Sequence, residues 1–402
     1  MKGFSKWIAI VLAASLFVVM GCTVSSGDGS SHDLATVTPV STSVKKYSIT
    51  IADGITNGTV TADKQTAAEG EKVTLSISPS ANFVLKSISV TDSENNLVSV
   101  TENGNTGSFT VPASNINVNA TFITFVGTEY FVTDYRVVDG NQYARQVFFG
   151  DWPQTIKASN VTVYKNKSIS VGIFTYFLGS DGAWYAKISE NAVNSELTYT
   201  DGSAVGQNGL TEKWFKVEKL KWRVLTSDYN GTGMKLLFAE KVLIGKPFNS
   251  STSLGNNYEN SDMRAWINGD FFNTAFTANL QKIIKKVSVR NDALSTNPNN
   301  KPRQWNDGWN QYASDTPTSD NVFLLSEQEV TTEDYEFTSD NSTRQRFATD
   351  YAKASGSKGD WWLRSPYYDN SWSIRFVNVN GLRSCLTVNK AIGVVPALCV
   401  NK

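Results

Sequence analysis

The stretches WWLRSP at 361–366 and GVVPAL at 393–398 bracket the most informative part of this chain. Between them, residues 367–389 read YYDNSWSIRFVNVNGLRSCLTVN. Aromatic, hydroxyl and amide side chains are mixed there as in antibody contact loops, where rigid rings supply contact area and small polar groups supply adaptable hydrogen bonds. We therefore expect a protein that binds a partner rather than one that transforms a substrate.

The polar residues of this segment argue against a continuous buried strand, because each would need a buried hydrogen-bond partner. Ile374, Phe376, Val377 and Val379 are instead predicted as core. Strand alternation points Arg375, Asn378 and Asn380 outward, and Gly381 turns the chain. For Trp372, contact and core remain equally open, since Trp serves both roles. The predicted ligand contacts are Tyr367, Tyr368, Asp369, Asn370, Ser371, Trp372, Ser373, Arg375, Asn378, Asn380, Leu382, Arg383, Ser384, Cys385, Thr387 and Asn389.

The residues at 361–366, in contrast, are predicted to be buried rather than to contact a ligand. Trp is largely buried on average, so Trp361, Trp362, Arg364 and Pro366 are predicted to build the framework beneath the contact segment.

The first residues predict export. Residues 1–21 combine a basic start with a short apolar run, which is typical of a cleaved signal. Val19–Met20–Gly21–Cys22 resembles a bacterial lipobox, so Cys22 would carry lipid and hold the protein on a membrane, at the outer membrane or cell surface. An ordinary secretory signal with an incidental Cys22 is the alternative. Residues 22–46 are rich in Ser, Thr, Gly and Asp and predict a flexible tether.

Composition excludes several classes of function. The chain has 37 basic and 37 acidic residues, so no net charge favours nucleic acid as a partner. Its only histidine, His32, lies in the tether, which removes Ser-His-Asp catalysis and histidine-ligated zinc from the folded part. Cys385 and Cys399 are too few for a disulfide framework. We expect two separate thiols, with Cys399 in the core, and a bridge between them is the alternative. We expect no cofactor and no metal.

Residues 47–125 predict a small all-β module. Short runs alternate apolar and polar residues, and Asp53–Gly54, Asn57–Gly58 and Asn103–Gly104 mark turns. The motifs at 58–60, 70–75 and 109–113 resemble the divergent internalin-type bacterial repeat. That resemblance implies a stalk in a surface protein, and independent ligand binding is the minor alternative.

Residues 127–402 predict a separate, larger domain. Ten of the eleven Trp residues lie there, which suits an aromatic core. Residues 221–225 and 234–243 predict strands. Residues 261–276 predict a helix capped by Ser261, and a second short helix is expected over 344–353. The polar stretch 291–321 lacks periodicity and is interpreted as a long loop.

Ordered motifs at 149–154, 222–225, 264–268, 322–326, 361–366 and 393–398 resemble a widespread bacterial domain with a C-type-lectin fold, related to formylglycine-generating enzymes. The resemblance implies an α+β head of mixed, mostly antiparallel strands with two or so helices. The architecture is also similar to treponemal lipoproteins diversified by retroelements, in which adenine-directed mutagenesis rewrites a C-terminal segment. By that resemblance the variable segment covers about 361–400.

The amino-acid content of the segment is consistent with such mutagenesis. Changing the adenines of an Asn codon reaches every residue type except Lys, Glu, Gln, Met and Trp, and in residues 367–389 only Trp372 belongs to that set. Lys and Glu are among the commonest residues of ordinary sequences, so their absence favours the interpretation.

The chain departs from its resemblances at three points. Val395 stands where relatives often carry Arg. The calcium-binding signatures of sugar-binding lectins and the paired cysteines of formylglycine-generating enzymes are absent, so neither calcium-dependent sugar binding nor catalysis is carried over. The first hypothesis is therefore a surface-anchored binder of an unidentified protein or glycan. A divergent enzyme of the formylglycine-generating type and a structural lipoprotein are the alternatives.

Carboxylates also cluster at 327–340. They predict a solvated helix and turn, because no EF-hand spacing is present. A calcium site or an acid/base pair is the alternative.

Overall fold

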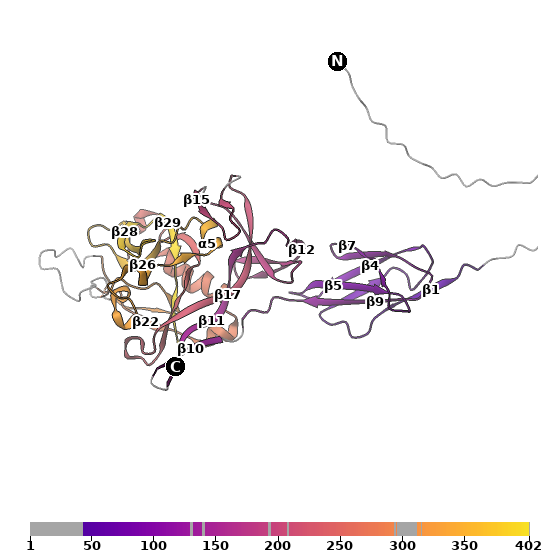
Figure 1. Ribbon diagram of the computed structural model, residues 1–402, viewed down its shortest axis with the longest axis horizontal. Helices are drawn as coiled ribbons and strands as arrows, with labels where there is room; N and C mark the ends of the chain where they lie inside the picture. Colours follow the sequence, from indigo (N-terminus) through magenta and orange to yellow (C-terminus); the bar gives the residue numbers. More distant parts are fainter. Residues whose placement is uncertain are drawn as a thin grey trace, which may run out of the picture. The chain divides into compact units, whose positions relative to one another are not determined.

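The computed structural model describes residues 43–128, 132–138, 141–191, 194–206, 209–292, 295, 312–314 and 316–401, without the side chains of 131–145 and 192–195. The predictions for the signal, Cys22, His32, most of the tether and much of the 291–321 stretch lie outside these residues. The described part is mostly β, with a few short helical segments (Figure 1). Strands predominate and helices are few, in agreement with the mostly antiparallel strands and two or so helices predicted for the head.

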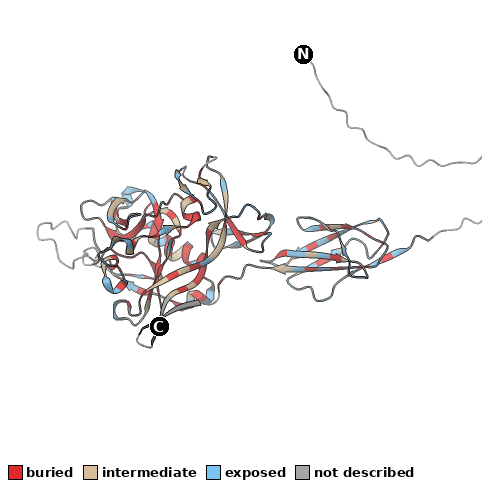
Figure 2. Ribbon diagram, in the orientation of Figure 1, coloured by how far each residue is buried: buried red, intermediate tan, exposed pale blue. Residues whose placement is uncertain are grey.

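The predicted all-β module is confirmed. Its two sheets have the strand orders β3-β1-β9-β5-β6 and β2-β4-β8-β7. In β4, Val73, Leu75 and Ile77 are buried while their neighbours are exposed, as strand alternation requires; Figure 2 shows this alternation. The strands are β1 Lys46–Ile51, β2 Gly58–Ala62, β3 Thr66–Ala68, β4 Lys72–Pro79, β5 Val84–Thr91, β6 Leu97–Val98, β7 Thr101–Asn103, β8 Thr106–Thr110 and β9 Ile116–Ile123.

The C-terminal region has its own sheets, and among the described residues no sheet combines strands from both sides of residue 125. The largest sheet follows the order β12-β13-β14-β17-β18-β30-β21, with β10, β11 and β24 joined to it. Its strands are β10 Val132–Val138, β11 Asn141–Ile156, β12 Val163–Val171, β13 Phe174–Gly179, β14 Trp184–Ser189, β17 Glu212–Thr226, β18 Lys235–Ala239, β21 Ile284–Lys285, β24 Val322–Phe323 and β30 Ala397–Val400. Short two-stranded pairs are β15 Asn194–Thr198 with β16 Ala204–Val205, β19 Lys241–Val242 with β25 Phe347–Ala348, and β22 Val287–Val289 with β23 Thr318–Asp320.

Aromatic side chains fill the core of this region. Trp152, Trp222, Trp361 and Trp362 are all fully buried. The indole N–H of Trp222 donates to the carbonyl of Phe149 over 2.9 Å, so this polar group is paired despite its burial.

The predicted helix over 261–276 is present as three short pieces. They are α1 Asp262–Trp266, a π-helical turn Ile267–Phe271 and α2 Phe272–Ala275. The predicted cap is confirmed, because the Ser261 hydroxyl accepts from the Arg264 N–H. A further helix, α3 Ala278–Ile283, follows.

The second predicted helix, over 344–353, is wrong in its first half. A 3₁₀ turn ends at Arg344 and α5 runs over Asp350–Ala354. The residues between them are extended, because β25 pairs in parallel with β19.

Candidate functional site

The predicted contact segment lies in a five-stranded sheet with the order β20-β29-β26-β27-β28. Its strands are β20 Ile244–Pro247, β26 Trp361–Pro366, β27 Ser373–Val377, β28 Arg383–Thr387 and β29 Ala391–Val394. The segment forms the loop after β26 and the whole β27–β28 hairpin. Figure 1 shows β26, β28 and β29 close together in the C-terminal region.

The hairpin has a core face and an outer face. Ile374 and Phe376 are buried, and Leu386 packs against the same core. Arg375 lies opposite Cys385 in the antiparallel register, so these two side chains share the outer face. Burial confirms Ile374, Phe376 and Val377 as core, although Val377 lies on the same side of β27 as Arg375. Val379 is not, since it is 44% exposed just beyond the end of β27.

Two tyrosines and an arginine meet on the outer face. The rings of Tyr367 and Tyr368 lie 4.7 Å apart, and the Arg375 guanidinium lies 4.9 Å from the Tyr367 ring centroid. Burial, together with a hydrogen bond to Tyr368, raises the pKa of Tyr367 to about 12. Tyr367 therefore stays protonated at neutral pH and presents a rigid, neutral ring.

Glu327 joins both strands of the hairpin. Its carboxylate oxygens are 3.0 Å from Arg375 Nε and 3.4 Å from Arg383 Nη1. The Glu327 side chain is 5% exposed, against 31% for Arg383. The prediction of a solvated carboxylate cluster is thus wrong for Glu327, and also for the buried Glu329. The missed signal is the apolar run at 322–325, which carries both glutamates directly into the core.

Asn256 fixes the loop between β26 and β27. The side-chain N–H₂ group of this buried residue lies 3.3, 2.9 and 2.7 Å from the carbonyl oxygens of Tyr367, Asn370 and Ser373. No local sequence pattern marks Asn256, because its partners lie more than 100 positions away. The contact loop is therefore held by its backbone, which leaves most of its side chains outside the framework.

The hairpin turn is also held by hydrogen bonds, both within the turn and from Arg344. The Asn378 side-chain oxygen accepts from the N–H groups of Asn380 and Leu382, at 2.9 and 3.0 Å. Arg344 Nε donates to the Gly381 carbonyl over 2.9 Å. Asn378 therefore has a structural role in the turn, which its assignment as a contact did not foresee.

The structure places the predicted contacts in three groups. Asp369, Trp372, Asn380, Leu382, Arg383 and Asn389 are exposed. Partly exposed are Tyr367, Tyr368, Asn370, Ser371, Arg375, Asn378, Ser384, Cys385 and Thr387. Ser373 is only 7% exposed, and here the contact prediction is corrected: its carbonyl accepts from Asn256 and from the Tyr367 N–H at the start of β27. Trp372, left open by the sequence, is 52% exposed.

The bracket residues are buried, as predicted. Arg364 forms a bidentate ion pair with Glu329, with N–O distances of 2.5 and 3.0 Å, and its Nη1 also donates to the Leu324 carbonyl. Burial opposes the charge of Glu329, but Arg364 and hydrogen bonds lower the pKa of this carboxyl overall. Val395 is buried without a charge of its own. The bracket thus serves as a rigid base.

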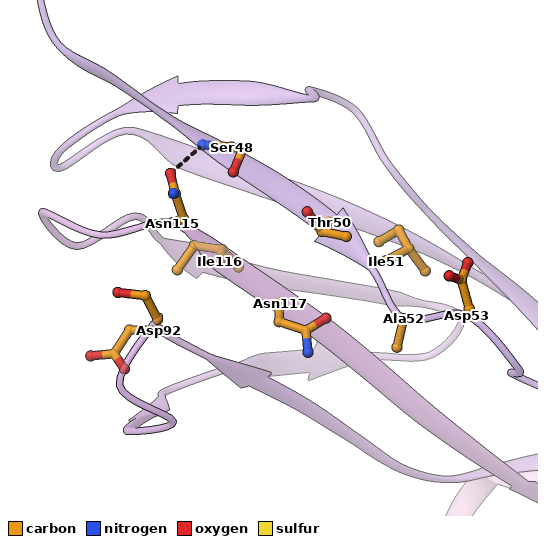
Figure 3. A pocket seen from close by; sticks show the side chains of 10 residues that line it. Ser48, Thr50, Ile51, Ala52, Asp53, Asp92, Asn115, Ile116 and Asn117 are labelled. Atoms are coloured by element: carbon orange, nitrogen blue, oxygen red, sulfur yellow. Dashed lines mark hydrogen bonds between the residues drawn. The ribbon is translucent and has the colours of Figure 1, made fainter.

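The repeat module has a separate groove of about 550 Å³, lined by β1, β9 and the turn at Asp92 (Figure 3). Its side chains are engaged in local structure: the Asn115 side-chain oxygen accepts from the Ser48 N–H, and the Asp92 carboxylate accepts from the N–H groups of Glu94 and Asn96. No chemistry-bearing cluster forms there.

Two cysteines lie among the described residues. Within these residues, no group of three or more His, Cys, Asp or Glu side chains is arranged to hold a metal ion. Cys385 and Cys399 are both free thiols, as expected, and Cys399 is buried. No helix of the described part is long and apolar enough to cross a membrane.

Two families match separate parts of the chain. Residues 47–124 match the Divergent InlB B-repeat domain, which confirms the resemblance drawn from the turn and strand motifs. Residues 232–402 match a family described as Domain of unknown function (DUF6273). No curated protein and no solved structure matches the chain.

Proposed function

We propose that this chain is a surface-anchored recognition protein that binds a ligand through the outer face of the β27–β28 hairpin. The contact face is defined here as Tyr367, Tyr368, Asp369, Trp372, Arg375, Asn380, Leu382 and Arg383. Lipid at Cys22 would anchor the chain, and the repeat module would serve as a stalk. Repeats of this kind occur in surface proteins, which supports the assignment.

The observation that carries the proposal is that residues 361–389 separate into a buried set and a set with exposed side chains. The bracket, Ile374 and Phe376 are buried, while Tyr367 and Tyr368 meet Arg375 and the side chains of Trp372 and Arg383 are exposed. Tyr, Trp and Arg are the residues that contribute most binding energy at protein interfaces. A rigid base with exchangeable outer side chains suits a segment that varies between copies of a gene.

The head resembles a C-type-lectin fold by its ordered motifs, and we propose that relationship for residues 127–402. The same resemblance supports a variable segment at about 361–400. No catalytic role is proposed, since the described residues offer no nucleophile–base pair on this face.

Binding of the purified full chain to whole cells, a glycan array and a protein array tests this function. The double variant Tyr368→Ala/Trp372→Ala should lose most of the signal that the unmodified chain gives, since truncating an interface anchor costs about 2 kcal/mol or more. Phe347→Ala is the matched control, because Phe347 is a 78% exposed aromatic residue outside the segment. Equal binding by the two variants would contradict the proposal.

A further inference from the structure

Strand β28 is an open edge of the sheet that carries the contact face. The strand order places β28 at one end and β20 at the other. The β20 edge is covered, because the Gly245 N–H donates to the Ser355 hydroxyl over 2.6 Å and a side chain at Gly245 would meet the Ser355 backbone. Within the described part of the chain, no strand pairs with the outer side of β28.

The hydrogen-bond register shows which backbone groups face outward. Asn378 N–H donates to Leu382, and Val388 N–H donates to Trp372, so these are bonded pairs of the antiparallel ladder. Because bonded pairs alternate along such a ladder, Ser384 and Leu386 direct their backbone groups toward β27. Arg383, Cys385 and Thr387 direct theirs away from it.

Most of these outward backbone groups have no hydrogen-bond partner among the residues that the structure describes. The Thr387 carbonyl accepts from the Lys390 N–H over 3.1 Å. Five of them make no hydrogen bond with the residues that the structure describes. They are the N–H and C=O groups of Arg383 and of Cys385, and the N–H of Thr387. An extended peptide laid along β28 would find donors and acceptors at strand spacing, beside the side chains of the contact face.

The charge beside this edge is positive. Arg375 and Arg383 share the single carboxylate of Glu327, with the shorter distance, 3.0 Å, to Arg375. Arg383 is the more exposed of the two, with 31% of its side chain accessible against 15% for Arg375. A carboxylate on a neighbouring strand would therefore complete the pairing of Arg383.

We propose that the ligand of this face is an extended, acidic peptide segment that adds to β28 as a further strand. The inference rests on the proposed function and specifies its ligand class. Main-chain hydrogen bonds would supply affinity, and Arg383 with Tyr367 and Tyr368 would select side chains. A glycan would use the contact side chains without needing the open backbone groups.

A random twelve-residue peptide library displayed on phage, selected on the purified full chain, is the first test. The recovered peptides should be enriched in Asp and Glu. Each selected peptide is then synthesised with N-methyl groups on alternate amides, in both phases. One phase should weaken binding at least tenfold, because those N–H groups would face β28, while the other phase should bind nearly as the parent. Equal effects of the two phases, or recovery of no acidic peptide, would overturn the proposal.

Proline at Cys385 supplies the test on the protein. Its N–H faces away from β27, so proline removes no internal ladder bond, and edge strands tolerate proline at such positions. Cys385→Pro should bind the selected peptides at least tenfold more weakly than Cys385→Ser, while thermal melting shows both variants folded. If Cys385→Pro fails to fold, the two methylation phases of the peptide still decide.

The two proposals fail in different ways. Binding that Tyr368→Ala weakens but Cys385→Pro leaves equal to Cys385→Ser would overturn the added strand and retain the contact face. Binding that only Cys385→Pro weakens would support the added strand and contradict the role of the tyrosines.

Discussion

Arg375 Nε lies 3.0 Å from Glu327 Oε2, which ties the middle of the candidate contact hairpin to a buried carboxylate in a segment about fifty positions earlier. The other oxygen of Glu327 lies 3.4 Å from Arg383 on the adjacent strand. One acidic group thus pairs with both strands, while the guanidinium of Arg375 also lies over the Tyr367 ring. The position of the contact face depends on this arrangement.

Replacing Glu327 should destabilise the fold. Glu327→Gln leaves two guanidinium groups without their counter-charge, and because both arginines keep some exposure we expect a loss of about 2 kcal/mol, below the range for fully buried pairs. Urea unfolding measures this change. Glu333→Gln is the matched control, since Glu333 is an exposed residue of the same acidic cluster and should change stability by less than about 0.5 kcal/mol. Equal stability of the two variants would show that the Glu327 pairing contributes nothing.

Acid should unfold the chain partly through Glu329. The pKa of this carboxyl is lowered in the fold, so its stabilising contribution is complete above the unfolded value of about 4.3 and is lost as pH falls through the lower folded value. Glu329→Gln should therefore be less stable than the unmodified chain at pH 7, and its stability should fall less steeply below about pH 4.5. Denaturant titrations from pH 7 to pH 3 measure both curves. Parallel curves would contradict the assignment.

The hairpin turn should require glycine at position 381. Gly381 has a φ of +78°, and an added Cβ would overlap the carbonyl oxygen of Asn341. Gly381→Ala should cost more than about 2 kcal/mol, because backbone strain and the clash add. Gly54→Ala is the control: its φ is +83° but nothing lies within 4 Å, so only the strain of about 1 kcal/mol applies. A smaller loss at Gly381 than at Gly54 would mean that the turn can move away from Asn341.

Much of the organisation was predictable from local patterns. Period-two alternation identified the repeat module, and the capping position of Ser261 identified the start of α1. The burial of Ile374 and Phe376 followed from the same alternation. These features depend on neighbours a few residues away, which a sequence displays directly.

The parts that were missed depend on distant partners. The sequence predicted solvent-exposed side chains for Glu327 and Glu329, because their arginine partners lie far away in the sequence. Ser373 and Asn378 read as contacts because their hydrogen bonds follow from the shape of the loop and turn. Val379 was predicted as core for its apolar side chain, although it lies beyond the end of β27 at Val377. Each of these wrong predictions therefore has one of two causes, a partner that is distant in the sequence or the position at which a strand ends.

Membrane attachment should depend on Cys22. With Cys22→Ser the full chain should move from the membrane to the soluble fraction after cell fractionation, because acyl chains are the anchor that we propose. Ser30→Ala, a change within the same tether, should leave attachment unchanged. Membrane association of Cys22→Ser equal to that of the control would contradict lipidation at this residue.

The central claim is that a rigid base presents outer side chains that can be exchanged, and a comparison of two libraries tests it most directly. One library of the full chain randomises Tyr368, Asp369, Trp372, Asn380 and Leu382, and the other randomises Trp361, Trp362, Leu363, Arg364 and Ser365. Display on yeast followed by protease treatment measures the fraction of folded members in each. We expect most members of the first library to resist protease nearly as the parent does, since exposed substitutions usually change stability by less than about 0.5 kcal/mol, and nearly all members of the second to be cleaved. Equal loss of folding in the two libraries would show that residues 368–382 belong to the core and would contradict the account.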